Sequence, residues 1–137
     1  MLTEGAGVPI GVAVAGANVH DQKLVEETLD SIPVRRPRPK PRKKQHLCAD
    51  KGYDANTVRK AAQRRRYVAH IPKKGERSST PARRRGKARR WVVERTHSWT
   101  NRARRLLIRW EKKVANYLGL LHLQFALNAL RAAGVLG

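Results

Sequence analysis

Two carboxylates stand out in this sequence because of the residues around them. Asp50 ends a short apolar run at residues 46–49, and Glu94 follows the apolar residues 91–93 inside a strongly basic segment. Two carboxylates on different elements can share divalent metal ions for phosphoryl transfer. All-oxygen ligands favour Mg²⁺ or Mn²⁺. The structural alternative remains open: Asp50 is then a turn residue, and Glu94 pairs with Arg90 one helical turn away.

The charge of the chain indicates a polyanionic partner. The 137 residues include 31 Lys plus Arg and 10 Asp plus Glu, a net charge of +21. Residues 31–90 hold most of this charge, in two basic loops at about 33–45 and 73–90. Alternating prolines exclude a helix from the first loop and favour an extended segment. Both loops are either solvated linkers or segments that lie on phosphates.

The periodicity of the apolar residues predicts the elements that position these groups. The expected order is strand, helix, strand, helix, strand, helix, helix, at about residues 8–16, 21–32, 46–49, 54–66, 67–72, 91 onward and 111–133. This order predicts one α/β domain with parallel strand pairing after the first strand. Asp21 and Asp54 are expected to cap their helices. The C-terminal apolar stretch is too interrupted for a membrane span.

Three stretches together resemble the DDE transposases of bacterial insertion sequences, which carry a ribonuclease-H-like catalytic domain. They are GVPIGVAVAGANVHD at residues 7–21, HLCADKGYDA at 46–55, and RRWVVERTHSWTNRARRLLIRWEKKVANYLGLLHL at 89–123. The resemblance covers nearly the whole chain. It implies that Asp50 is the second metal-binding Asp and Glu94 the metal-binding Glu, with Mg²⁺ or Mn²⁺ as the cofactor of a complete site.

The region around the Glu matches the family pattern in part. The pattern is Tyr, two residues, Arg, three residues, Glu, six residues, Lys; Arg90 and Glu94 match, whereas Lys87 and Asn101 stand at the Tyr and Lys positions. From charge, we expect other cations to contact the DNA, and the full expected set is Lys43, Lys44, Arg90, Arg95, Arg102 and Arg105. Trp91, Trp99 and Trp110 lie among these arginines; core packing of at least two is favoured over stacking on bases.

The resemblance also implies that the domain is incomplete. Residues 1–5 resemble the end of the family's second strand, so the first two strands and the first catalytic Asp are expected to be absent. Asp21 is a less favoured substitute for that Asp. The chain at 1–137 is then a partial catalytic domain in the bacterial cytoplasm that binds transposon ends but has little activity alone. Its expected partners are DNA and either an upstream half of the transposase or further copies of itself. The alternatives are a non-catalytic basic nucleic-acid-binding protein and a regulator of an intact transposase.

Overall fold

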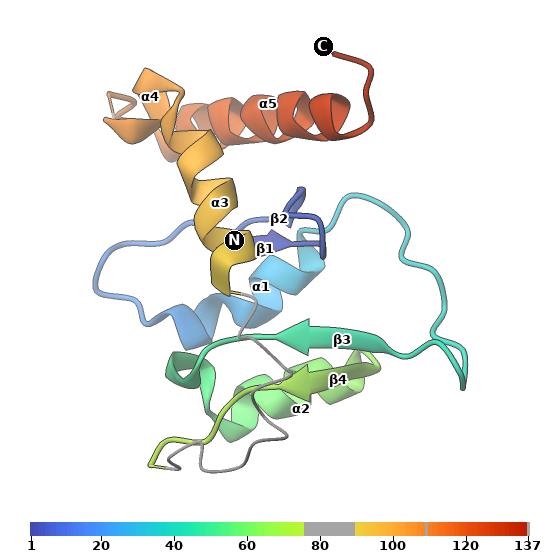
Figure 1. Cartoon of the computed structure of the whole chain (residues 1–137). Coiled ribbons are helices and arrows are strands. Elements are labelled where there is room, and N and C mark those ends of the chain that lie inside the picture. The colour runs from blue at the N-terminus through green and yellow to red at the C-terminus, as the bar shows by residue number, and fades with distance from the viewer. Residues whose placement is uncertain (76–89, 109, 137) are drawn as a thin grey trace.

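The computed structural model describes residues 1–75, 90–108 and 110–136, and for Arg90 the backbone alone. The described residues form two small sheets, five α-helices and two 3₁₀ turns (Figure 1). The predicted α/β order is confirmed, with an extra strand before it and a short helix between the last two. The elements are β1 (Leu2–Thr3), β2 (Pro9–Gly11), η1 (Asp21–Leu24), α1 (Val25–Asp30), β3 (Gln45–Cys48), η2 (Lys51–Tyr53), α2 (Asn56–Arg64), β4 (Tyr67–His70), α3 (Arg90–Asn101), α4 (Arg104–Leu107) and α5 (Val114–Ala132).

The second sheet confirms the predicted parallel pairing. β3 and β4 pair in parallel, from Gln45 opposite Tyr67 to Cys48 opposite His70. α2 connects the two strands and packs on β4. Two of its buried residues come three and four positions after the first, so all three share one helical face: Val58, Ala61 and Ala62. The carboxyl ends of both strands lie at the same edge of the sheet, where the chain leaves toward η2 and toward Lys73.

The first sheet is an antiparallel hairpin that is shorter than predicted. β1 and β2 pair with Leu2 opposite Gly11. The expected strand over residues 8–16 ends at Gly11 because the backbone N–H of Val12 donates to the Ser31 hydroxyl, at 2.8 Å. Val12 and Val14 then pack against the C-terminal helices. The hairpin is therefore stopped by contacts that lie far away in the sequence.

The first helix also differs from its predicted bounds of 21–32. It begins with the 3₁₀ turn η1 and ends at Asp30. Its end agrees with Pro33, because a proline disfavours helical backbone in the residue before it. The predicted cap at Asp21 is wrong: Asp21 is the first residue of η1, and no side-chain hydrogen bond caps that turn.

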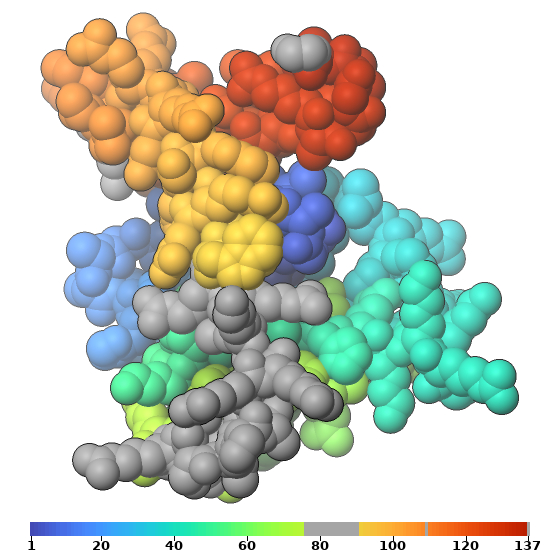
Figure 2. Space-filling model, in the orientation of Figure 1, coloured from blue at the N-terminus to red at the C-terminus, as the bar shows by residue number. Residues whose placement is uncertain are grey.

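Two apolar clusters hold the layers together, and the N-terminus contributes to both. The first cluster contains Leu29 of α1, Leu47 of β3 and Ala62 of α2, with Leu2 packed against it. The second contains Leu106 of α4 and Leu121 and Phe125 of α5, with Met1 packed against it. The β1–β2 hairpin accordingly lies between the β3–β4 layer and α5, and α3 crosses it in contact with β1 (Figures 1 and 2). No helix within the described ranges is long and apolar enough to cross a membrane.

The proline-rich basic loop is non-helical, as predicted, but it folds back on itself. The backbones of Lys40 and Lys43 pair in a tight turn, in which the Lys43 N–H donates to the Lys40 carbonyl at 3.0 Å. The Gln45 side-chain amide donates to the Pro37 carbonyl at 2.9 Å. These contacts bring the loop back to the start of β3. Of the second basic loop, residues 76–89 lie outside the described residues.

Candidate functional site

Asp50 lies two residues beyond β3, at the edge where both parallel strands end. Its carboxylate oxygen Oδ1 accepts a hydrogen bond from the Gly52 N–H at 2.7 Å and so caps η2. The residue is exposed. In open α/β sheets, ligands bind outside the carboxyl ends of the strands. The turn therefore fixes an exposed carboxylate at the edge of the sheet that suits a ligand.

A hollow of about 560 Å³ opens beside this carboxylate. It is lined by Asp50, Lys51, Gly52, Lys74 and Gly75. The two lysines lie in different segments of the chain: Lys51 follows β3, and Lys74 follows β4. Two ammonium groups beside the hollow attract anions such as a phosphodiester. The hollow thus places a carboxylate and two cations from separate parts of the chain around one space.

Sequence reasoning missed that η1 packs against the Asp50 turn. The Gln22 side-chain amide donates to the Gly52 carbonyl. Burial raises the pKa of the Tyr53 phenol, and the negative charges of Asp21 and then of Asp50 raise it further. Both carboxylates therefore act on the same hydroxyl. No local pattern could have revealed this, because nearly thirty residues separate the two acids and only the fold brings η1 to η2.

Asp54 has a different role from the predicted helix cap. The N-terminal cap position of α2 is Ala55, and no side chain caps it. The Asp54 carboxylate instead accepts from the Arg59 guanidinium at 2.7 Å and from the backbone N–H of Lys74 at 2.8 Å. Arg59 also donates to the Ile71 carbonyl at 2.8 Å. Asp54 therefore ties the start of α2 to the segment after β4 that forms one wall of the hollow.

We expect Asp54 to make the stability of the chain sensitive to acid. The Arg59 hydrogen bond, followed by that from Lys74, lowers the pKa of Asp54 in the folded chain. Its stabilising contribution is present above the unfolded pKa of about 3.9 and is lost as the pH falls through the lower folded value. Between about pH 5 and pH 2, the urea midpoint of the parent chain should fall more steeply than that of Asp54→Asn. Parallel curves for the two proteins would contradict this role.

Glu94 is exposed on α3, on the face opposite to the one that packs. The buried residues of α3 lie four apart, at Val92, Thr96 and Thr100. The fully buried Thr96 hydroxyl donates to the Gly7 carbonyl at 2.6 Å, which joins the helix to the turn of the β1–β2 hairpin. Figure 2 shows α3 lying across that N-terminal hairpin. The hairpin turn therefore sets the orientation of the helix that carries Glu94.

Arg95 strengthens the same attachment. Its guanidinium donates to the Ala6 carbonyl and lies 4.8 Å from the ring centroids of both Trp91 and Trp99. The expectation of core packing for at least two tryptophans is wrong, since Trp91 is 51% exposed and Trp110 is 70% exposed. The exposed ring of Trp91 instead covers the arginine that holds α3 in place. Whether Arg95 also contacts DNA stays a prediction.

Two of the shifted pKa values involve the amine of Met1. The pKa of the Met1 amine is lowered by burial, against the opposing effect of Asp21. The pKa of His97 is lowered by burial and then by the positive Met1 amine. His97 lies three residues after Glu94 on α3, and Asp21 adjoins the Asp50 turn. The Met1 amine therefore interacts with Asp21 and with His97.

The oxygen donors of the two candidate carboxylates fit a magnesium site, but the described residues do not bring a complete set of metal ligands together. Asp50 and Glu94 offer carboxylate oxygens, and Mg²⁺ is usually held by one or two carboxylates together with substrate phosphates. In the parts of the chain that the structure describes, no three His, Cys, Asp or Glu side chains gather where they could hold a metal ion. The described residues thus supply two suitable carboxylates and not a closed site.

The expected DNA-contacting cations fall into three groups. Lys43 and Lys44 are exposed just before β3, and Arg102 and Arg105 are exposed around α4. Arg105 lies 3.9 Å from Glu111, a long contact in which the arginine side chain stays 74% exposed and therefore accessible. Arg90 belongs to α3, and its side chain lies outside what the structure describes. Four of the six expected cations are thus accessible on the surface.

Comparison with known proteins identifies the family. The family model "Transposase DDE domain" matches residues 1–129. A curated protein of Burkholderia cepacia, "Putative transposase for insertion sequence element IS402", is 36% identical over 138 positions, covering 97% of this chain and 64% of that relative. The chain thus spans somewhat less than two thirds of the relative's length. No solved structure matches the chain significantly. The predicted resemblance is confirmed: the chain belongs to the DDE transposase domain family, which implies a ribonuclease-H-like fold.

Proposed function

We propose that this chain supplies Asp50 and Glu94 as metal-binding carboxylates of a transposase that cuts and joins the ends of insertion sequence DNA in bacteria. The observation that carries the proposal is the position of Asp50. It stands at the carboxyl edge of a parallel strand pair, beside a hollow that Lys51 and Lys74 also line. The family match over residues 1–129 supports the same assignment.

Each group at the site has a role that follows from its contacts. Bound Mg²⁺ or Mn²⁺ would activate the attacking oxygen and stabilise the leaving oxygen of a phosphodiester. The Gly52 N–H orients the Asp50 carboxylate. Lys51 and Lys74 bind the phosphodiester beside it, and the hairpin turn holds Glu94 through Thr96 and Arg95. The chain's own residues therefore position the acids and neutralise the DNA backbone.

A complete site requires a third carboxylate, which we place on a strand outside these 137 residues. In the described part of the chain, β3 pairs with β4 alone, and β1 and β2 form a separate sheet. The other edge of β3 accordingly offers backbone groups to a further strand. Such a strand would come from an upstream part of the transposase or from another copy of the protein. Asp21 remains the substitute that we favour less.

A second candidate function is DNA binding without catalysis. The chain would then be either a basic nucleic-acid-binding protein or a regulator of an intact transposase. The observation that favours it is the lack of a three-ligand cluster within the described ranges. In that case Asp50 serves only as the cap of η2, through its bond to Gly52. Replacement of Asp50 would then leave DNA binding unchanged and would have no effect on metal binding.

Binding of duplex DNA as a function of salt tests the DNA-binding part of the proposed function. We expect the affinity of the parent chain for DNA to fall steeply as the salt concentration rises. Each neutralised phosphate contributes about 0.9 to the slope of log K against log salt. Lys43→Gln/Lys44→Gln should lower that slope by about 1.8 if each lysine contacts one phosphate. Fluorescence anisotropy of a labelled 24-base-pair duplex, with its length chosen as about two helical turns, measures the slope.

The matched control is Lys112→Gln/Lys113→Gln, which removes the same charge from two adjacent exposed lysines before α5. This control should leave the slope unchanged, because we assign neither lysine to DNA. Equal slopes for parent and Lys43→Gln/Lys44→Gln would contradict the assigned contacts. The same preparations should show no strand cleavage with Mg²⁺. Cleavage that is lost in Asp50→Ala would contradict the need for a third carboxylate.

A further inference from the structure

A second basic pocket lies at the opposite end of the β3–β4 sheet from Asp50. It has a volume of about 410 Å³ and is lined by two prolines and five arginines: Arg36, Arg38, Arg64, Arg65 and Arg66. The arginines come from the proline-rich loop and from the end of α2. They meet near the start of β3 and β4, where Gln45 lies opposite Tyr67. None of these arginines belongs to the candidate site described above.

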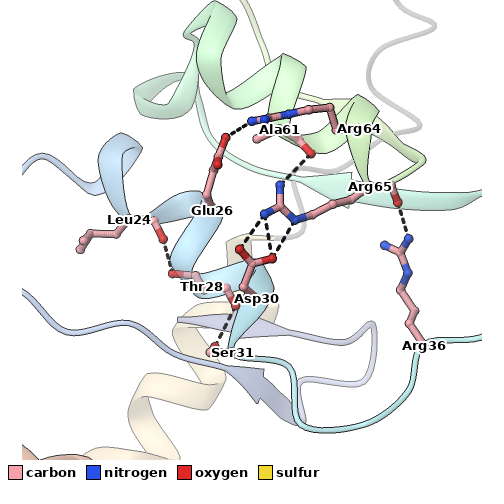
Figure 3. A network of polar contacts seen from close by, with 9 residues as sticks. All are labelled: Leu24, Glu26, Thr28, Asp30, Ser31, Arg36, Ala61, Arg64 and Arg65. Atoms are coloured by element: carbon pink, nitrogen blue, oxygen red, sulfur yellow. Dashed lines mark hydrogen bonds and ion pairs between the residues drawn. The ribbon is translucent and has the colours of Figure 1, made fainter.

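Most of these arginines are held in place by the fold (Figure 3). Arg65 donates to both oxygens of Asp30, at 2.7 and 2.8 Å, and Arg64 donates to Glu26. Arg36 donates to the Arg65 carbonyl, and its guanidinium lies 4.0 Å above the Tyr67 ring. Within the described residues, two carboxylates therefore oppose five guanidinium groups around the pocket. An excess of positive charge is left on a preorganised surface.

Arg66 adopts a backbone conformation that normally favours glycine. Its φ is +59°, and its N–H donates to the Gln63 carbonyl at 2.8 Å in the turn that leads from α2 to β4. An arginine at such a position is strained, and a glycine would fit with less strain. Observed strain of this kind supports a role for the side chain itself. The turn therefore holds a cation where the backbone alone would favour a residue without a side chain.

The pocket lies too far from Asp50 to bind the same phosphate. Asp50 comes five positions after Gln45 along extended chain, which corresponds to roughly 16 Å. This is about half of one turn of duplex DNA, taking a turn as about 34 Å. A duplex with one phosphate at the Asp50 hollow can therefore present another phosphate near the pocket. The rigid fork of a guanidinium binds phosphate oxygens in pairs.

We propose that this pocket binds backbone phosphates of the DNA, as a second anchor about half a helical turn from the Asp50 hollow. The inference rests on the proposed function, because it assumes that DNA is the partner. Arg38 and Arg66 provide the main contacts, since Arg36, Arg64 and Arg65 are engaged with the protein. The anchor is independent of sequence and fixes the direction in which the duplex crosses the sheet.

The salt dependence of duplex binding tests this inference in the full chain. Arg38→Gln/Arg66→Gln should lower the slope of log K against log salt by about 1.8, and Arg66→Gln alone by about 0.9. The control matched to Arg66→Gln is Arg131→Gln, which also removes one exposed cation, near the end of α5. This control should leave the slope unchanged. If the parent binds DNA and the double variant has the same slope, the proposed anchor is wrong and the proposed function still stands. Absence of DNA binding by the parent would overturn the proposed function as well.

A glycine variant distinguishes the effect of removing the charge of Arg66 from the effect of destabilising the fold. Arg66→Gly relieves the backbone strain at φ +59° and removes the same charge. It should therefore unfold at the same or a higher urea concentration than the parent, while its salt slope falls by about 0.9. A parent-like slope in this stably folded variant would overturn the role of Arg66.

Discussion

Replacing Gly7 with alanine is expected to destabilise the chain strongly. Gly7 has a φ of +90°, and an added Cβ would lie 2.8 Å from Nη2 of Arg95 and 3.4 Å from the Thr96 hydroxyl. The backbone strain alone costs roughly 1–3 kcal/mol. The contact also displaces Arg95 and Thr96, which hold α3. We therefore expect a loss of about 3 kcal/mol in the free energy of unfolding, which is within the range of severe single mutations.

Urea denaturation measures this loss, and Gly119→Ala is the matched control. Gly119 lies within α5, and an added Cβ there meets nothing within 4 Å. Alanine at that position should stabilise the chain by about 0.5–1 kcal/mol, because glycine weakens a helix interior. A Gly7→Ala variant as stable as the parent would contradict the account of how the hairpin turn positions the helix of Glu94.

The secondary structure could be predicted from local patterns where one face of an element is apolar. α2 has that pattern in Val58, Ala61 and Ala62, and the parallel pairing of β3 with β4 follows from the helix between them. The bounds failed where a distant partner decides them. Val12 leaves the strand because Ser31 accepts its N–H. Ser31 follows α1, nineteen positions further along the chain, and no local pattern at Val12 points to it.

The candidate site could be predicted only in part for the same reason. Asp50 stands out in the sequence by its place after an apolar strand, and its role as a metal ligand stays a prediction. The predicted caps at Asp21 and Asp54 were wrong: no side chain caps η1 or α2. The Asp54 carboxylate is occupied instead by Arg59 and by the backbone N–H of Lys74, twenty positions away. The attachment of Arg95 to the hairpin has no signature in the sequence, since 89 positions separate it from Ala6.

Loss of Asp50 or Glu94 is expected to have the largest effect on metal binding. Both carboxylates are exposed and contribute oxygens and negative charge. Because ligand charge sets the affinity of an oxygen site, Asp50→Asn should weaken Mn²⁺ binding by about tenfold or more. Glu94→Gln should weaken it as well. Asp21→Asn is the matched control, since Asp21 also lies near Tyr53 and carries the same charge.

The most direct measurement of the central claim is paramagnetic broadening of the backbone amide signals by Mn²⁺, with duplex DNA present to supply phosphate ligands. In the parent chain and in Asp21→Asn, Mn²⁺ should broaden the signals of Gly52 and Tyr53, next to Asp50, and of His97, one turn after Glu94. Asp50→Asn should abolish the broadening at Gly52, and Glu94→Gln should reduce it at His97. Parent-like broadening at these signals in both variants would contradict the assignment of Asp50 and Glu94 as metal-binding carboxylates.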